Sequence, residues 1–452
     1  MDIRNRKSIS VALIIVGIAL ACVVGSIPGT DAGVQAQGAV IDYGDYDTIW
    51  TDADLSIFTT EQTLLEHICE ENGLELTMAE DGTVSSIGDR QSGDERSWDL
   101  LVVYPGSTNW VKLDAPYDQC PSEFTVSSWS YLSEGDTPTV AVDYNGNPIY
   151  GFQQKHRVVT LSPTLTEIAA SLNAVNVLVG ADSYSNYPES VNAAKNSGKI
   201  TTVGTYTGPS FELIMGTNPD VVFCDGSQRS HMQMSAQLRD VEIDAMLLYP
   251  GEDVQSILDN IFIVGTVMNY EIAAKQVINE TNEVLDQLSS MALGPDAGPS
   301  PDVMISLEPD ISPWVSGDGT YMDNIVELFN ADNVFSEWGG WVHITSDRIP
   351  YENPSLIIVV TTEYAATQEE YDYLYSHLSA QWKDTDAWKS GNVYVLCEGA
   401  AEMAQRFGPR TAQMAELVAM ILHPSAFENE VPKFIGDDYE DYLSYSSYMS
   451  ID

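Results

Sequence analysis

An uninterrupted helical stretch near the middle of the chain is the feature that most constrains its fold. Residues 271–291 contain neither Gly nor Pro, and their apolar residues recur at helical spacing. A helix of this length is about 30 Å long, which is roughly the diameter of a small domain. The Gly- and Pro-rich run at 294–301 ends it. The chain therefore places one long helix between the part that folds before it and the part that folds after it.

Strand-like and helix-like segments alternate on both sides of this helix. Before it, apolar runs such as 157–161 and 220–224 alternate with helical patterns such as 233–240. After it, the runs 303–307 and 356–361 continue the same alternation. Alternating strands and helices are typical of parallel sheets covered by helices. The sequence predicts an α/β fold with two α/β lobes joined by one long helix.

The region before the first lobe has a different pattern. Residues 61–72 form its one clear helix, and 74–78, 98–104 and 139–144 have the pattern of strands. We therefore expect a separate N-terminal α+β domain that is mostly β. The predicted organisation is a signal peptide or membrane anchor at 1–38, a small β-rich domain at 39–150, lobe 1 at 151–270, the linking helix at 271–293, and lobe 2 with an acidic C-terminal tail at 294–452.

The N-terminus has the pattern of an export signal. Arg4, Arg6 and Lys7 precede an uncharged apolar run over 9–24. Three alternatives are open: cleavage after a small-residue site at 34–36, lipidation at Cys22, or retention as an N-terminal helix that spans the membrane. Since the positive charge stays inside, all three place the rest of the chain outside the cytoplasm, in an extracellular or cell-surface location.

The charge of the chain excludes several classes of partner. The chain of 452 residues has 19 Lys and Arg against 67 Asp and Glu, a formal net charge of −48. Nucleic acid binding is excluded because basic residues must neutralise the phosphates. Peripheral docking on anionic lipid is disfavoured for the same reason. Hydrophobic residues make up 44% of the chain, so it can form well-packed cores.

The five cysteines suggest one disulfide at most. Cys69 and Cys120 both lie in the small domain, and an exported domain can form a disulfide between them. Two free buried thiols are the alternative. The chain has no Cys-x-x-Cys motif or Cys/His cluster, which makes a structural zinc site unexpected.

Several motifs in the two predicted lobes occur together in one known family. The first lobe has RVVTLSPTLTE at 157–167, VGADSYSNYP at 179–188 and PSFELI at 209–214, and the second has WVSG at 314–317 and VELFNADNV at 326–334. Their order and spacing over residues 155–430 resemble the periplasmic binding proteins for cobalamin, haem and ferric siderophores.

The resemblance implies the substrate-binding protein of an ABC importer, with ligand held in the cleft between two lobes. Its partners are a permease dimer and the ATPase of that permease. Two acidic residues, one on each lobe, dock onto permease arginines in this family, and by position these are Glu212 and Glu327. Carboxylates far apart on one face would fix orientation and speed encounter. An ordinary role as exposed helix glutamates is the alternative.

Aromatic side chains are expected to line the cleft because flat ligands bury area against rings. Arg406 and Arg410 could meet a ligand carboxylate or phosphate, or Arg410 could only organise its loop. Cys224 and Cys397 end strands and could ligate a metal, although core thiols are far commoner there. No His stands at a convincing axial-ligand position. The ligand-binding candidates are Tyr184, Tyr187, Tyr206, Phe223, Trp314, Trp341 and Arg406.

The small domain resembles the β domain of transcobalamin-like surface proteins. The resemblance rests on TLLEHI at 63–68, GLEL at 73–76, GTVSSIG at 82–88 and Trp98. Together the two resemblances favour cobalamin or another corrinoid as the ligand, with a ferric siderophore or haem as the alternative. A spacer or adhesive domain without ligand contact is the other interpretation of this region.

An enzyme is disfavoured by the motifs that the chain lacks. There is no Gly-x-Ser-x-Gly elbow, P-loop, His-Glu-x-x-His or Rossmann glycine run, and the six His are scattered. We expect no catalytic residues, no resident metal and no cofactor of its own. A cell-surface sensor or adhesion protein with the same lobes but without transport remains the alternative class.

Overall fold

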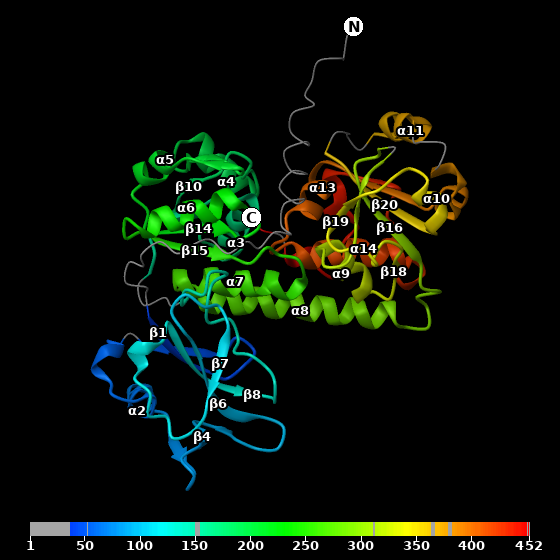
Figure 1. Cartoon of the computed structure of the whole chain (residues 1–452). Coiled ribbons are helices and arrows are strands. Elements are labelled where there is room, and N and C mark those ends of the chain that lie inside the picture. The colour runs from blue at the N-terminus through cyan, green and yellow to red at the C-terminus, as the bar shows by residue number, and fades with distance from the viewer. Residues whose placement is uncertain are drawn as a thin grey trace.

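The computed structural model describes residues 37–449 and 451, apart from 52, 150–153, 311, 363–366 and 378–381. It has a small β domain and two α/β lobes. The helix α8 (Glu271–Ala292) runs beneath both lobes, and α7 (Val254–Met268) packs on it beneath lobe 1. The two helices separate the lobes from the β domain (Figure 1). The predicted export segment lies outside the described residues. In the part of the chain that is described, no helix has the length and apolarity to cross a membrane.

The β domain is a five-stranded sheet in the order β2-β1-β8-β6-β7, with α2 (Glu61–Glu71) packed on it. Thr60 caps this helix, and Leu64, Leu65 and Ile68 share a fully buried core with sheet residues such as Trp129. The predicted helix is thus confirmed. The strands are β1 (Gly38–Asp42), β2 (Thr48–Thr51), β6 (Ser97–Val103), β7 (Trp110–Leu113) and β8 (Val126–Leu132), with a second small sheet of β3 (Leu76–Met78), β4 (Val84–Ile87) and β5 (Arg90–Gln91).

Lobe 1 is a parallel sheet in the order β11-β10-β9-β14-β15. Its central strand β9 (Val158–Thr160) is fully buried, as expected for a parallel strand covered on both faces. The other elements are β10 (Leu178–Ala181), β11 (Thr201–Thr202), β14 (Val221–Asp225), β15 (Asp244–Leu248), the hairpin β12 (Gly204–Thr205) and β13 (Gly208–Pro209), and the helices α3 (Pro163–Ser171), α4 (Glu189–Asn196), α5 (Phe211–Gly216) and α6 (Arg229–Arg239).

Lobe 2 is a mixed sheet in the order β19-β17-β16-β20-β21-β22, and β18 also pairs with β16. β17 and β19 are antiparallel to their neighbours, and the other pairs are parallel. The elements are β16 (Asp302–Leu307), β17 (Trp314–Ser316), β18 (Asp332–Asn333), β19 (Trp341–His343), β20 (Leu356–Val360), β21 (Val393–Leu396), β22 (Phe434–Ile435), α9 (Tyr321–Leu328), α10 (Arg348–Glu352), α11 (Gln368–His377), α12 (Asp386–Ser390), α13 (Glu398–Gln405) and α14 (Thr411–Leu422).

The linking helix α8 confirms the two-lobe architecture predicted from its sequence. It has 22 residues and packs on α7 of lobe 1 and on α14 of lobe 2. A Cβ on Gly265 of α7 would lie 2.3 Å from the Cβ of Ala274, so the close contact of α7 with α8 requires glycine there. The sequence analysis did not single out α7. This helix is buried almost all round and therefore lacks the one-sided apolar pattern that reveals a surface helix.

The β domain is anchored to the side of α7 and α8 that faces away from the lobes (Figure 1). The Tyr46 hydroxyl donates to Asp259 Oδ1 at 2.7 Å, and its ring packs 5.0 Å from that of Phe262. Lys275 of α8 lies 3.4 Å from Asp47 of the β domain. These contacts make the domain part of one body with the helix pair and place it away from the top of the lobes.

One prediction about a connecting segment was wrong. Residues 139–144 do not form a strand, because Asp143 turns the chain: its Oδ1 accepts hydrogen bonds from Asn145 N and Asn147 N, both at 2.9 Å. The predicted acidic C-terminal tail forms an ordered strap on lobe 2. It adds β22 to the sheet, and the buried Glu416 accepts from Ser446 N at 2.8 Å.

Candidate ligand site at the lobe junction

The carboxyl ends of the strands in both sheets lead toward the junction of the lobes. In lobe 1, Ser162 follows β9 and opens α3, and Asp182 follows β10. In lobe 2, Glu398 follows β21 and opens α13. Ligands of α/β sheets bind at such strand ends, because loops and helix starts gather there. The junction is therefore the place in this fold where a site is expected.

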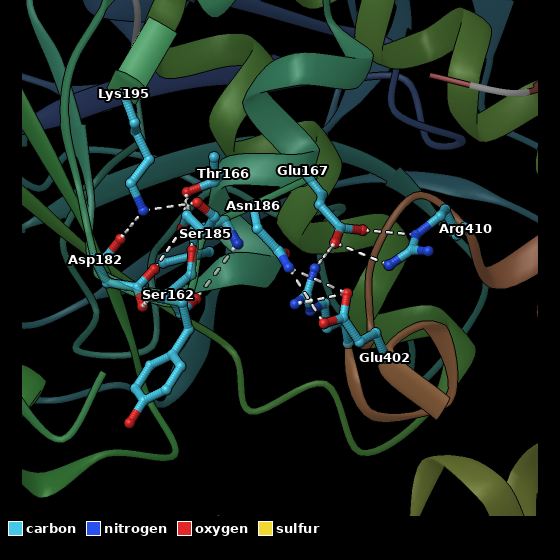
Figure 2. A network of polar contacts seen from close by, with 12 residues as sticks. Ser162, Thr166, Glu167, Asp182, Ser185, Asn186, Lys195, Glu402 and Arg410 are labelled. Carbon is cyan, nitrogen blue, oxygen red and sulfur yellow. Dashed lines mark hydrogen bonds and ion pairs between the residues drawn. The ribbon is translucent and has the colours of Figure 1, made fainter. Parts of the chain in front are cut away.

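A buried ion-pair network joins the lobes at this point (Figure 2). Glu167 of α3 is 1% exposed, and Arg410 of lobe 2 is 3% exposed. Arg410 Nε and Nη2 both donate to the Glu167 carboxylate at 2.9 Å, and Arg406 Nη1 donates to it at 3.0 Å. One carboxylate of lobe 1 thus holds two guanidinium groups of lobe 2.

Further contacts complete this network around Arg410. Its guanidinium lies 4.1 Å above the ring of Tyr187 and donates to the Tyr439 hydroxyl at 3.2 Å. Burial alone would lower the pKa of Arg410, but Glu167 and Tyr439 together raise it above its ordinary value. Arg410 is therefore always charged, and it needs the carboxylate that faces it.

A second polar bridge crosses the junction beside the first. Arg406 Nη2 pairs with Glu402 at 3.0 Å, and Asn186 of lobe 1 donates to Glu402 Oε1 at 3.2 Å. Asn186 and Glu402 are both close to the Glu167 network in Figure 2. The two bridges fix the loop after β10 to α13, so they limit how far the lobes can separate.

A chain of hydroxyl groups supports the lobe 1 side of the network. Thr166 Oγ1 lies 2.7 Å from both Thr160 Oγ1 and Ser185 Oγ, and Ser185 donates to the buried Asp182. Lys195 Nζ donates to the backbone oxygens of Asp182 and Ser185 at 2.9 and 2.7 Å. Burial raises the pKa of Asp182, although its hydrogen bonds oppose this shift. The cluster holds the loop that carries Tyr184, Asn186 and Tyr187.

Tyr206, between β12 and β13, is held by residues at the end of β14. Its hydroxyl contacts Asp225 Oδ2 at 3.0 Å and Ser227 Oγ at 3.2 Å. Asp225 N donates to His231 Nδ1 at 3.0 Å, so the proton of this imidazole is on Nε2 and faces Tyr206 O at 2.6 Å. Burial lowers the pKa of His231 although Asp225 opposes it, and the neutral ring serves as a structural bridge.

The remaining predicted aromatic residues are in different settings. Tyr184 is 43% exposed, and Tyr187 is half-buried beneath Arg410. Trp314 starts β17, opposite His343 of the edge strand β19, and their rings lie 5.4 Å apart. Trp341 is half-buried at the other end of β19. Tyr184 and Trp314 are thus available to a ligand at the strand ends, whereas Tyr187 is already engaged in the protein.

Two predictions about ligand contacts need correction, and the two strand-end cysteines have the commoner role of core thiols. Phe223 is completely buried, because it points into the core beneath the sheet and not toward the strand end. Arg406 is engaged by Glu167 and Glu402, so its charge is already neutralised within the protein. Of the cysteines considered as metal ligands, Cys224 is buried in the lobe 1 core and Cys397 donates to Ile435 O. The described residues contain no cluster of side chains suited to a metal ion.

Of the two alternatives for Cys69 and Cys120, the structure has two free thiols and not a disulfide. Cys69 points into the core of the β domain from α2. Cys120 instead contacts Phe58 O at 3.5 Å and Ser122 Oγ at 3.1 Å. The two side chains therefore serve separate parts of the domain.

The two glutamates predicted to dock on a permease lie at different distances from the helix pair α7 and α8. Glu212 is exposed on α5, at the end of lobe 1 farthest from α7 and α8 (Figure 1). Glu327 is exposed near the end of α9, where Ser289 of α8 donates to Leu328 O at 3.5 Å. The structure leaves both carboxylates exposed, and their joint docking on one partner surface stays a prediction.

Glu167 is the functional residue that the sequence analysis missed. Ser162 is the N-cap of α3, and Glu167, five residues further along, points to the other lobe. Only the contact with lobe 2 reveals its role. Two surface pockets, of about 330 and 250 Å³, lie elsewhere. One is between α7, α8 and α9, and the other is under the C-terminal strap, and neither contains a predicted ligand residue.

Comparison with known proteins agrees with this fold. The family described as Periplasmic binding protein matches residues 158–399, which is more than half of the chain, and the chain belongs to that family. At the level of the family it is a binding protein and not an enzyme. The β domain lies outside the matched residues.

The individual relatives include an ABC transporter substrate-binding lipoprotein and a vitamin B12-binding protein. The chain is 22% identical over 292 residues to the uncharacterized ABC transporter substrate-binding lipoprotein YvrC of Bacillus subtilis, covering 64% of this chain and 87% of that protein. It is 24% identical over 240 residues to a vitamin B12-binding protein of Yersinia pseudotuberculosis, covering 51% and 75%.

Two solved structures share the fold at a TM-score of 0.51. One is a possible iron-binding protein of Staphylococcus epidermidis, 20% identical, covering 60% of this chain and all of that one. The other is a periplasmic heme-binding protein of Pseudomonas aeruginosa, 17% identical, covering 60% and 94%. These structures confirm the two-lobe fold of this class, in which one long helix joins the lobes.

Proposed function

We propose that the chain is the extracytoplasmic substrate-binding protein of an ABC importer and that it delivers cobalamin or a related corrinoid. The observation that carries the proposal is the lobe junction, where strand ends of two sheets meet over a buried ion-pair floor. Tyr184, Tyr206 and Trp314 stand at those strand ends. Large, mostly apolar ligands gain affinity from such rings, while the fixed floor avoids the cost of closing the lobes.

The charges at the floor favour a ligand with little negative charge. Arg406 and Arg410 both face Glu167, and Lys195 donates to backbone oxygens of lobe 1. These three cations are therefore occupied within the protein and are not available to ligand carboxylates. A corrinoid, which is rich in amides, suits this floor better than a ligand with several carboxylates.

A ferric siderophore or haem is the second candidate, and one observation favours it. Arg229 is exposed at the start of α6, two residues after Ser227, which contacts the Tyr206 hydroxyl. A guanidinium at that place could meet an anionic group of a ligand. The names of the relatives, which include vitamin B12-, heme- and iron-binding proteins, are consistent with either ligand class.

Calorimetric titration of the exported chain decides between these ligands. The probes are cobalamin, haemin and a ferric hydroxamate siderophore, each added to the protein that includes the β domain, because that domain is anchored to α7 and α8. Heat and a spectral shift with cobalamin support the proposal. Binding of haemin or the siderophore alone would replace the corrinoid, and no binding of any probe would favour a surface sensor or adhesion protein.

The position of the β domain supports a role as spacer. It sits on α7 and α8, whereas the strand ends of the lobes and α5 lie on the other side of this helix pair (Figure 1). A cap over the ligand, which the transcobalamin-like resemblance implied, would require the domain to leave these contacts. We propose that it instead sets the distance of the lobes from the membrane or cell wall.

We propose that the end of lobe 1 that carries Glu212 docks on the permease. Glu212→Arg should reduce uptake by the importer and leave ligand affinity unchanged, because the residue lies far from the junction. Glu327→Arg is the matched variant in lobe 2, an exposed helix glutamate beside α8, and it tests the joint docking. Equal uptake by the wild type and the Glu212→Arg variant would refute the assignment.

A further inference from the structure

We propose that Tyr144, in the segment between the β domain and lobe 1, is a ligand contact of the junction and helps to determine which ligand binds. The inference rests on the proposed binding function and adds a residue to its site. Tyr144 precedes residue 158, where the family match begins, so the contact comes from outside the part of the chain that matches the family.

The backbone next to Tyr144 is fixed to the end of β15. Asp143 is 1% exposed, and its Oδ2 accepts from Arg239 Nη2 at 2.8 Å and from Leu247 N at 3.0 Å. Tyr144 N in turn donates to Leu247 O at 2.8 Å. Because buried charge-assisted hydrogen bonds are strong and directional, this anchor holds Tyr144 in register with the last residues of the strand.

The ring of Tyr144 lies over Gly226, in the loop that also holds Tyr206. A Cβ on Gly226 would come within 2.8 Å of Tyr144 Cδ1 and 2.3 Å of Leu248 O, so only glycine admits the ring there. Asp225 and Ser227, on either side of Gly226, contact the Tyr206 hydroxyl at 3.0 and 3.2 Å. Tyr144 and Tyr206 therefore flank one short loop at the strand end.

The protein holds the side chain of Tyr144 in place but leaves part of the residue exposed to solvent. Its ring packs edge-on against Tyr249, with centroids 5.8 Å apart, and 36% of the residue is exposed. Tyr249 in turn donates to Val142 O at 3.2 Å. An aromatic side chain that is already held in place loses little conformational entropy when a ligand covers its free face. This combination distinguishes Tyr144 from Phe223, which is buried, and from Tyr187, which is engaged by Arg410.

The test compares two variants of Tyr144 with a matched control in the exported chain. Tyr104→Ala removes another partly exposed β-domain tyrosine, 42% exposed and packed on Phe124, which lies away from the junction. Each protein is titrated by calorimetry with cobalamin, haemin and a ferric hydroxamate siderophore. For the probe that the wild type binds, Tyr144→Ala should raise Kd roughly tenfold, the loss expected for one ring contact. Tyr144→Phe and Tyr104→Ala should stay within about twofold, because both keep that ring.

The outcomes separate this inference from the function on which it rests. If the wild type binds a probe and Tyr144→Ala binds it equally well, the contact is overturned and the binding function stands. If the wild type binds none of the probes, the proposed function fails and the inference fails with it. Should Tyr144→Ala not fold, Tyr144→Leu keeps an apolar contact on Gly226 while removing the aromatic face, and it is judged by the same change in Kd.

Discussion

Replacing Glu167 with Gln tests whether the ion-pair floor holds the lobes together. This change keeps the size of the side chain and removes its charge. Arg410 and Arg406, which now donate to the carboxylate at 2.9 to 3.0 Å, would then share one neutral amide. Because Arg410 is 3% exposed, water cannot replace the lost charge.

The size of the effect follows from the burial of the pair. Removing one partner of a buried ion pair typically costs about 3 to 5 kcal/mol, since the other charge stays buried without compensation. Arg406 keeps Glu402 at 3.0 Å, so part of the loss is offset. We therefore expect Glu167→Gln to lower the free energy of unfolding of the lobes by about 3 kcal/mol.

Urea unfolding followed by tryptophan fluorescence measures this difference. The control is Glu212→Gln, an exposed glutamate whose replacement should change the free energy of unfolding by less than about 0.5 kcal/mol. The double variant Glu167→Met with Arg410→Met removes both charges and should recover most of the loss. A loss below about 1 kcal/mol for Glu167→Gln would refute the reasoning and leave α7 and α8 as the elements that hold the lobes.

Two further predictions concern the β domain. Burial raises the pKa of Glu61 to about 7, although Ser127 donates a hydrogen bond to it. The folded state therefore favours the protonated carboxyl group. The stability that this group contributes is complete below its ordinary pKa and is lost as the pH rises through 7. In the wild type, the free energy of unfolding measured in urea should fall by about 2 to 3 kcal/mol between pH 5 and 8, and Glu61→Gln should abolish this fall. A variant with the same pH profile as the wild type would contradict this. Tyr46→Phe removes the 2.7 Å hydrogen bond to Asp259 and should destabilise the docking of the domain by about 1 kcal/mol. Faster hydrogen exchange in β1 and α7 would show it, and unchanged exchange would argue against this anchor.

The sequence was sufficient for the parts of the fold that depend on local pattern. The stretch without Gly or Pro predicted α8, and the alternation of strands with helices predicted two α/β lobes. The expected parallel sheet is confirmed in lobe 1, whereas the sheet of lobe 2 is mixed because β17 and β19 run antiparallel to their neighbours. The one-sided spacing of Leu64, Leu65 and Ile68 predicted α2. These features are encoded by neighbours in the chain, so periodicity reveals them. The helix α7 is buried on nearly every side, so its apolar residues show no helical period and the pattern does not predict it.

The candidate site depended on contacts between residues far apart in the chain. Glu167 and Arg410 meet only because α8 sets the lobes side by side, and no spacing in the sequence shows that they pair. Phe223 and Tyr206 looked alike as aromatic residues near strand ends, but the side of the strand placed one in the core and the other at the loop of Asp225.

The sequence by itself determined the class of the protein, its acidic character and the order of its three folded parts. The tertiary structure alone decided which charges are neutralised, that Glu212 and Glu327 lie at different distances from α7 and α8, and that the β domain rests on this helix pair. The physical reason is that burial and charge pairing depend on distances across the fold. A local pattern specifies the faces of helices and strands, whereas packing determines what each face meets.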